Sequence, residues 1–449
     1  MKVNPNPDAW ASGFPTDEEV ARVTEIKEVA VIGLGYIGLP TAAILAANGI
    51  RVYGVDVNER NVSAVNNGEV PFVEPELGDF VSRGVSSGML SASLAAPAAD
   101  AYILAVPTPF NDDYSADLSY IEAAADGIAP LLTGRELVIL ESTSPPGTTE
   151  HLARYFAAAR PDLDLDQLHV AHCPERVLPG YVMRELVTND RVVGGMTPRA
   201  AQLAKELYET FCEAEILTTD AATAEMSKLV ENSYRDVNIA FANELSKISD
   251  KLGINVWELI DLANHHPRVN ILQPGPGVGG HCIAVDPWFI VAAAPEESKL
   301  IRQARETNDS KPRWVVAKTE EAMAQAPGAP VALLGLAFKK NIDDLRESPA
   351  IQIALDLAAK HPQTTFLVSE PNIEVLPASF ACASNVQLTA TDAAIEQSGT
   401  IVLLVDHDEY SNVEPAQLAG KLVVDTRGQW RSIADAAAAG AEILEDINA

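Results

Sequence analysis

The chain has 449 residues, and its 63 acidic and 32 basic residues give a formal net charge of −31 at pH 7. A charge of this sign and size argues against a nucleic-acid partner and against an anionic membrane surface, since both are themselves negative. A hydrophobic content of 47% with 21% charged residues is typical of a globular protein, and the length suggests roughly two to four domains.

The N-terminal segment and the cysteines give no sign of export. Residues 1–25 lack the apolar core of a signal peptide, and we expect a loosely held extension there. The four cysteines show no CxxC pair, which disfavours a disulfide framework or a structural zinc site and favours a reducing cytoplasm. We expect Cys173, Cys212 and Cys382 to be small buried side chains, and Cys282 to be more accessible.

Residues 26–218 predict an open α/β domain. Apolar runs without polar alternation are separated by helical segments, as in parallel strands that are covered on both faces. The uncharged stretch 29–50 contains Pro40 and several glycines, so it favours a strand, a turn and a helix over a membrane span. The expected strands lie at 28–35, 51–57, 101–109, 137–144 and 169–175.

A different pattern begins near Asp220. Ala221 to Leu252 contains no Pro or Gly and has apolar residues at helical spacing, which predicts one long helix within a connector and dimerisation region, 219–325. Residues 326–449 then predict a second open α/β domain with a helix over Pro349–Lys360. The expected fold is therefore α/β: two doubly wound (Rossmann-like) parallel-sheet domains joined by a long central helix.

A G-x-G-x-x-G motif stands between the first expected strand and helix, and Asp56 ends the second strand. Such glycines allow a tight turn, close approach to a pyrophosphate and close helix packing, while the acid accepts from ribose hydroxyls and favours NAD over NADP. The alternative is a packing turn without a ligand. Thr108 and Thr143 end later strands, where Ser and Thr are also ordinary turn residues. The candidate cofactor residues here are Gly33, Gly35, Tyr36, Ile37, Gly38, Asp56, Arg60, Thr108 and Thr143.

One thiol, Cys282, follows the glycine-rich segment 275–280, whose backbone N–H groups could approach phosphate or carbonyl oxygens. Lys228 and Asn232 are one turn apart on the long helix. The alternative for Cys282 is a small buried thiol, and the alternative for Lys228 and Asn232 is a solvated helix face. Asp286 lies four residues after Cys282, and the histidines of this region show no metal-ligand spacing.

Six motifs resemble the nucleotide-sugar 6-dehydrogenases, the family that includes the UDP-glucose and GDP-mannose dehydrogenases. They run in order from about residue 28 to about residue 431: GLGYIGLPTA, ESTSPPGTTE, CPERVLPG, EMSKLVENSYRDVNIAFANEL, PGPGVGGHCIAVDP and GLAFKKNIDDLRESPA. The resemblance implies a cytoplasmic enzyme of polysaccharide biosynthesis. Such an enzyme oxidises the C6 alcohol of a sugar to a carboxylate and uses two NAD⁺.

The resemblance also implies catalytic roles. The Cys282 thiolate would add to the C6 aldehyde, and the adduct would be oxidised to a thioester that water hydrolyses. Lys228 would stabilise the oxyanion, Asn232 would hydrogen-bond the same oxygen or a water, and Asp286 would orient Lys228 or a water. Glu175 would activate the hydrolytic water.

For substrate and cofactor, the resemblance implies that Thr143 holds a water and that Arg346 faces the cofactor or a phosphate. An arginine such as Arg268 can reach the neighbouring subunit's site, which favours a homodimer or a higher oligomer. Ordinary surface bases are the alternative for Arg268, Lys339, Arg346 and Arg427. The implied UDP-sugar contacts are Glu175, Arg176, Val177, Lys228, Asn232, Arg268, Gly277, Gly279, Gly280, Phe338, Lys339 and Arg427.

Residues 266–291 are most similar to the branch of the family that acts on UDP-N-acetyl-D-mannosamine. Val285 and Pro179 stand where many UDP-glucose dehydrogenases carry a lysine and a glutamate, which disfavours UDP-glucose. UDP-N-acetylglucosamine is an alternative substrate. Two alternative functions also stay open: a two-electron β-hydroxyacid dehydrogenase, which can use a Lys-x-x-x-Asn pair without Cys282, and a nucleotide-sugar sensor without catalysis.

Overall fold

The structure is a computed structural model that describes residues 25–111, 113–164, 167–178, 180–280 and 282–430. The chain divides into two compact units between Leu229 and Val230. Apart from Glu25, the extension expected at residues 1–25 lies outside the described residues, and so does Pro179. Among the described residues, no helix combines the length and the apolar content that crossing a bilayer requires.

The first unit is built on a sheet whose strands are β1 (Glu28–Ile32), β2 (Arg51–Val55), β3 (Leu90–Ser93), β4 (Ala101–Leu104), β5 (Leu137–Leu140), β6 (His169–His172), β7 (Arg191–Gly195) and β8 (Ile216–Asp220). Their order in the sheet is β3-β2-β1-β4-β5-β6-β7-β8. The order reverses at β1, which pairs in parallel with both β2 and β4. In open α/β sheets, ligands bind beside the carboxyl ends of the strands at such a reversal.

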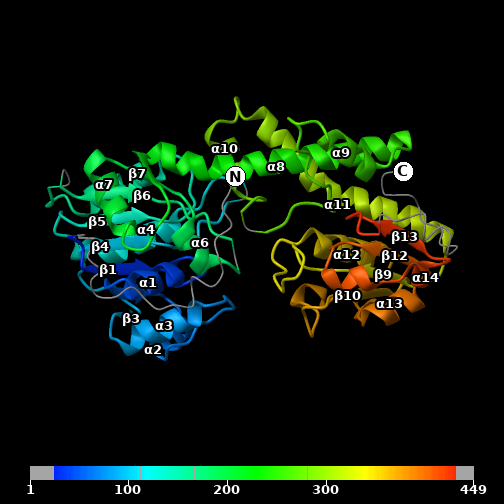
Figure 1. The fold of residues 1–449 in the computed structure, drawn as a ribbon, viewed down its shortest axis with the longest axis horizontal. Helices are drawn as coiled ribbons and strands as arrows, with labels where there is room; N and C mark the ends of the chain where they lie inside the picture. The colour runs from blue at the N-terminus through cyan, green and yellow to red at the C-terminus, as the bar shows by residue number, and fades with distance from the viewer. Residues whose placement is uncertain (1–24, 112, 165–166, 179, 281, 431–449) are drawn as a thin grey trace. The chain divides into compact units, whose positions relative to one another are not determined.

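Helices cover both faces of this sheet (Figure 1). Successive residues of β1 point to opposite faces: Val29 and Val31 join one buried cluster, whereas Ala30 and Ile32 join another. This explains the continuous apolar strands of the sequence. The helices are α1 (Gly38–Ala47), α2 (Glu59–Asn66), α3 (Leu77–Ser86), α4 (Ser119–Ile128), α5 (Thr148–Ala159), α6 (Val182–Thr188) and α7 (Pro198–Tyr208).

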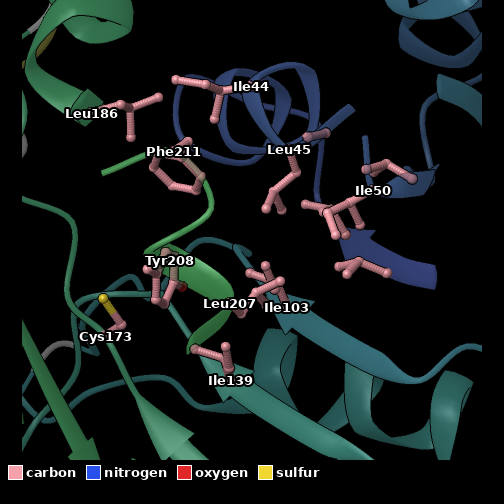
Figure 2. Packing of buried hydrophobic residues seen from close by; sticks show 14 of the residues in the cluster. Ile44, Leu45, Ile50, Ile103, Ile139, Cys173, Leu186, Leu207, Tyr208 and Phe211 are labelled. Atoms are coloured by element: carbon pink, nitrogen blue, oxygen red, sulfur yellow. The ribbon is translucent and has the colours of Figure 1, made fainter. Parts of the chain in front are cut away.

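Figure 2 shows the first of these clusters, in which α1 and α7 pack on the sheet. Ile44 and Leu45 come from α1 and Leu207 from α7, and they share the cluster with Ile103 of β4 and Ile139 of β5. All five are at most 2% exposed. Burying a large aliphatic side chain contributes about 1.5–3 kcal/mol, so this layer holds the first sheet to its helices.

The sheet has three strands that the sequence did not predict, β3, β7 and β8. β3 is only four residues long and has no apolar run. β7 and β8 pair in parallel with each other, but β7 is antiparallel to β6. Both strands were missed for a physical reason: the buried end of β7 is a Gly-Gly pair, and β8 is largely exposed and polar. A Cβ on Gly194 would lie 2.4 Å from the carbonyl oxygen of Asp220, so this close strand pairing requires glycine.

The long helix predicted from Ala221 to Leu252 is confirmed as α8, with the same bounds. In the second unit it is followed by α9 (Val256–Asn264), α10 (Asp286–Ala293) and α11 (Lys299–Gln325). The length of α11 is a finding of the structure, since Pro312 lies inside it.

The second sheet confirms a second parallel α/β fold. Its strands are β9 (Val331–Leu334), β10 (Phe366–Ser369), β11 (Val386–Leu388), β12 (Thr400–Leu403) and β13 (Leu422–Asp425), in the order β11-β10-β9-β12-β13 with every pair parallel. Its further helices are α12 (Pro349–Lys360), α13 (Thr391–Gln397) and α14 (Pro415–Leu418). The helix predicted over Pro349–Lys360 is therefore correct.

Three of the four cysteines lie as expected and one does not. Cys173 and Cys212 are buried, and Cys282 is exposed. The expectation that Cys382 is buried is wrong, because it is exposed. In that segment Phe380 supplies the buried side chain, at 5% exposure, and Cys382 follows it in a turn.

Candidate active site

The turn between β1 and α1 has the geometry of a pyrophosphate site. Gly33 has a φ of +98°, and a Cβ there would lie 2.5 Å from the carbonyl oxygen of Ala105. A Cβ on Gly38 would lie 1.9 Å from the Gly33 carbonyl oxygen. A Cβ on Gly35 would meet nothing within 4 Å. Gly33 and Gly38 are therefore required by packing, whereas Gly35 leaves open space beside the N-terminus of α1, where a phosphate is favoured.

Asp56 directly follows β2 and joins that strand to the glycine turn. Its Oδ2 accepts hydrogen bonds from the Leu34 N–H at 3.0 Å and from Asn61 Nδ2 at 3.1 Å. Its Oδ1 accepts from the Asn58 N–H at 2.8 Å. A carboxylate has about four acceptor positions, so Asp56 fixes the turn and can still accept from a ribose. Arg60 is exposed in the first turn of α2.

Three further predicted cofactor residues follow strands β1, β4 and β5. Tyr36 is 40% exposed and stacks on Phe72, with ring centroids 4.3 Å apart. The hydroxyl oxygen of Thr108 is buried and has no hydrogen-bond partner among the described residues. Thr143 is half-buried after β5. A buried hydroxyl without a partner is costly, so Thr108 fits a hydrogen bond to a bound molecule at this edge.

Glu175 follows β6 and is 9% exposed. Its Oε2 lies 3.3 Å from a guanidinium nitrogen of Arg191, and its Oε1 accepts from the Arg176 N–H at 2.6 Å. Arg176 and Val177 are half-buried beside it. Arg191 lies over the ring of Tyr208, 4.8 Å from its centroid. Arg191 was not among the predicted site residues; the available signal in the sequence was a basic residue at the start of an apolar run.

Glu141 is a second carboxyl of this buried cluster, at the end of β5. It accepts hydrogen bonds from the hydroxyls of Tyr208, at 2.8 Å, and Thr41, at 3.3 Å. Burial, and next the charge of Glu175, raise the pKa of Glu141 to about 7, although Arg191 and the two hydroxyls oppose the shift. Glu141 therefore changes charge near neutral pH.

The raised pKa of Glu141 predicts that the free energy of unfolding falls as the pH rises. Its pKa lies above the ordinary 4.5, so between pH 4.5 and about 7 the folded chain keeps a proton that the unfolded chain releases. The free energy of unfolding should decline across that window by up to on the order of 3 kcal/mol. Glu141→Gln should remove this decline, as measured by urea unfolding at pH 5 and pH 8. An equal pH dependence in both proteins would contradict the assignment.

The start of α8 is anchored by Glu225, which is 1% exposed. Its carboxylate accepts from the N–H groups of Gly147 and Thr149 and from the Thr149 hydroxyl, each at 2.6 Å. These donors lie at the N-terminus of α5, where a negative charge is favoured. Lys228 follows on the same helix and is half-buried. The first unit thus holds Lys228, Thr143 and Glu175.

The second unit brings together the other three predicted catalytic residues. Asn232 of α8 donates through Nδ2 to Asp286 Oδ2 at 2.5 Å. Asp286 is the first residue of α10, is 4% exposed, and donates its N–H to the Cys282 carbonyl at 2.9 Å. We expected Asp286 to orient Lys228 or a water; the structure shows that Asn232 is one of its side-chain partners. The exposed thiol therefore stands one turn before a helix whose start is tied to α8.

The glycine-rich segment that precedes the thiol packs closely on the C-terminal sheet domain. Gly277 and Gly280 have φ values of +150° and +83°. A Cβ on Gly279 would lie 2.5 Å from the Glu347 carbonyl oxygen, and one on Gly280 would lie 3.1 Å from the ring of Phe338. These glycines are thus required by packing, a reason that the sequence analysis did not give.

The predicted substrate cations of the second unit differ in their surroundings. Arg427 donates through Nε to Asp406 Oδ1 at 2.7 Å, and Arg346 is paired with Asp344. Lys339 and Arg268 are exposed. A cavity of about 500 Å³ in the same unit is lined by residues that include Val278, Asn308, Arg346 and Pro349.

Three family models match the chain in succession. The NAD-binding domain of the UDP-glucose/GDP-mannose dehydrogenase family matches residues 27–212, its central domain residues 222–310, and its UDP-binding domain residues 332–432. The chain belongs to this family.

Individual relatives are similar to the chain over nearly their whole length. A UDP-N-acetyl-D-mannosamine dehydrogenase of Salmonella typhi is 54% identical over 418 residues, 90% of this chain and 99% of the relative. An NDP-N-acetyl-D-galactosaminuronic acid dehydrogenase of Ralstonia nicotianae is 53% identical over 413 residues, 90% of this chain and 97% of the relative. The solved structure of a UDP-D-ManNAc dehydrogenase from Pyrococcus horikoshii is 37% identical, with a TM-score of 0.80, and covers 90% of this chain and 96% of that one.

The chain is accordingly an NAD-dependent nucleotide-sugar 6-dehydrogenase. Its NAD-binding domain contains the glycine turn and Asp56 described above. Its UDP-binding domain contains Lys339, Arg346 and Arg427, and supports a UDP sugar as the substrate. The predictions of family, cofactor and reaction type are confirmed.

Proposed function

We propose that the chain oxidises the C6 hydroxyl of UDP-N-acetyl-D-mannosamine to the carboxylate in the cytoplasm. The observation that carries the chemistry is the exposed thiol of Cys282, one turn before α10. Its backbone carbonyl accepts from the N–H of Asp286, which pairs with Asn232. The relatives support the sugar, since UDP-N-acetyl-D-mannosamine dehydrogenases from several bacteria are 53–54% identical to the chain.

The Cys282 thiol acts between the two oxidations of the sugar C6. NAD⁺, when bound by the NAD-binding domain, would supply the hydride acceptor for each of the two oxidations. After the first, the Cys282 thiolate adds to the C6 aldehyde; a C–S bond forms and the carbonyl oxygen becomes an alkoxide. Lys228 and Asn232 stabilise that oxygen while C6 loses its second hydride, which leaves a thioester.

Glu175 completes the reaction. It takes a proton from water as the water attacks the thioester carbonyl. The C–S bond then breaks, which releases the sugar carboxylate and returns Cys282 to the thiolate. Asp286 keeps Asn232 in place, and Thr143 holds a water at the carboxyl end of β5. On this assignment the two buried carboxylates Glu175 and Asp286 have distinct roles.

A panel of nucleotide sugars tests the proposal. Purified protein is incubated separately with excess NAD⁺ and limiting UDP-N-acetylmannosamine, UDP-N-acetylgalactosamine, UDP-N-acetylglucosamine or UDP-glucose, and NADH is counted per sugar. We expect two NADH per sugar and the highest kcat/KM with UDP-N-acetylmannosamine. The Ralstonia relative, at 53% identity, makes the galactosamine sugar the second candidate. A preference for it would overturn our choice of sugar but leave the chemistry in place.

We also propose that the enzyme is a homodimer formed through α8. Five apolar residues spaced four or seven apart share one face of this helix, and each is at least 46% exposed. A continuous apolar stripe of this kind on a helix is typical of an interface. Its members are Val230, Tyr234, Phe241, Ile248 and Leu252.

Charges in this stripe are expected to separate the subunits. Tyr234→Glu with Phe241→Glu places two carboxylates in the proposed interface, where desolvation and mutual repulsion oppose association. Light scattering at micromolar concentration should give the mass of a dimer for the unaltered chain and of a monomer for the double variant. Val375→Glu, at a residue 77% exposed in the C-terminal sheet domain, is the control. A monomeric unaltered chain would refute the proposal.

A further inference from the structure

A buried polar network lies between α8 and α11 in the second unit. Asp236 and Asn243 of α8 and Arg305 and Asn308 of α11 are each at most 1% exposed. Burying two charges and two amides is costly unless each finds partners. Two helices can pack with apolar side chains alone, so this network raises the question of what it holds.

One end of the network holds the backbone next to the thiol. Arg305 donates to Asp236 Oδ1, and the same guanidinium nitrogen donates to the Ile283 carbonyl oxygen at 3.3 Å. Ile283 directly follows Cys282. Asn308 Nδ2 donates to Asp236 Oδ1 at 2.8 Å and to the Asp236 carbonyl at 3.1 Å. The ion pair is thereby joined to the next turn of α11.

The other end holds the start of the glycine-rich segment. Asn243 Nδ2 donates to Asn308 Oδ1 at 2.8 Å. Asn243 Oδ1 accepts from the Gly275 N–H at 2.9 Å. One chain of hydrogen bonds thus runs from Ile283 through Arg305, Asp236, Asn308 and Asn243 to Gly275. We call residues 275–280 with 282–283 the thiol loop; the network contacts it on both sides of Cys282.

We propose that Arg305 and Asn243 are positioning residues that fix the thiol loop and thereby the place of the Cys282 sulfur. Neither side chain is accessible, so neither contacts the substrate. A loop with four glycines in six residues has much conformational freedom to lose. The network orders it before the substrate arrives. An adduct-forming thiol requires this, because a displacement of about 1 Å can cost on the order of 10²-fold in rate.

The proposal deepens the proposed function, since it assumes that Cys282 forms the adduct. It predicts a specific fault when the network is broken. The first oxidation should continue, whereas capture of the aldehyde by a displaced thiol should fail in part. Free aldehyde should leave the enzyme, and the yield should fall below two NADH per sugar. A general loss of folding would lower the rate without changing that ratio.

Three variants of the full chain test this. Asn243→Ala removes the acceptor of the Gly275 N–H. Arg305→Met with Asp236→Asn removes the donor to Ile283 without leaving a buried carboxylate unpaired. Lys311→Met is the matched control. Lys311 is 2% exposed, its ammonium donates to Ser246 Oγ across the same two helices, and among the described residues it forms no hydrogen bond to the thiol loop.

Hydrogen exchange of the peptide containing residues 275–285 is the first measurement, and trapped aldehyde and NADH per sugar are the second. We expect loop exchange to rise at least tenfold in the first two variants and to stay unchanged in Lys311→Met at matched thermal stability. A fourth variant, Arg305→Lys, keeps a positively charged donor. Its yield of NADH per sugar should lie between that of the Arg305→Met, Asp236→Asn variant and that of the unaltered chain. Unchanged loop exchange in the first two variants, an equal rise in the control, or a ratio that stays at two would each overturn the proposal. If the unaltered chain makes no NADH from any sugar, the proposed function fails, while loop exchange still decides the positioning role.

Discussion

Replacing Cys282 with serine is expected to lower kcat for the full oxidation by on the order of 10³-fold or more, as is usual when a covalent nucleophile is removed. A serine hydroxyl is a weak nucleophile at neutral pH without an activating base, so the aldehyde is no longer captured. Affinity for NAD should be unchanged. NADH formation and mass spectrometry of the sugar product together measure the effect.

Cys382→Ser is the control, because Cys382 is the other exposed thiol among the described residues. It should retain the activity of the unaltered chain. Two NADH per sugar at normal rate in Cys282→Ser would contradict the covalent route. One NADH per molecule of substrate, with no dependence on Cys282, would instead favour the two-electron dehydrogenase that the Lys228–Asn232 spacing left open.

The fold was predictable where a segment's own residues decide its structure. The absence of Gly and Pro from Ala221 to Leu252 predicts α8, and the continuous apolar runs predict most of the parallel strands in the two sheets. β8 was not predictable, because a short edge strand with exposed Leu217 and Thr218 has neither an apolar run nor a clear alternation. Its pairing with β7 depends on close backbone approach, not on side-chain pattern.

The candidate site divides in the same way. Gly33, Gly38 and Asp56 were recognisable because their spacing along one strand–helix–strand segment is itself the motif, although Gly33 also packs against the distant Ala105. Arg305 was not, because a lone arginine in a polar helix looks like a solvated residue. Its partner Asp236 is 69 residues away in the chain. Only the packing of α8 against α11 shows that both are buried.

The net charge of −31 does not conflict with a diphosphate ligand. A strongly acidic protein repels such a ligand at long range, yet the cofactor turn presents backbone N–H groups at the start of α1, which carry no net charge. Lys339 and Arg268 are exposed in the second unit. We therefore expect a few placed cations and helix N-termini to recognise the phosphates, although the protein as a whole is acidic.

The hydrolytic step gives the second large effect. Glu175→Gln should leave both hydride transfers in place and slow hydrolysis of the thioester by about 10²–10⁴-fold, the usual contribution of a general base. A stopped-flow experiment with excess sugar and NAD⁺ should then show a rapid burst of two NADH per active site, followed by a slow steady state. Intact-mass and peptide analysis should find the sugar acyl group on Cys282.

The burst of NADH distinguishes a general base from a residue that only holds its neighbours in place. Glu175 also pairs with Arg191 at 3.3 Å, so its loss could disturb the buried cluster without touching any water. In that case the burst and the steady state would fall together, and no acyl group would accumulate. Glu185→Gln is a suitable comparison, since Glu185 accepts from the nearby Leu178 N–H at 2.7 Å and has no proposed chemical role. A thioester trapped in Glu175→Gln but not in Glu185→Gln would show that Glu175 is the general base. A slowed first hydride transfer would instead show that Glu175 serves to hold Arg191 in place.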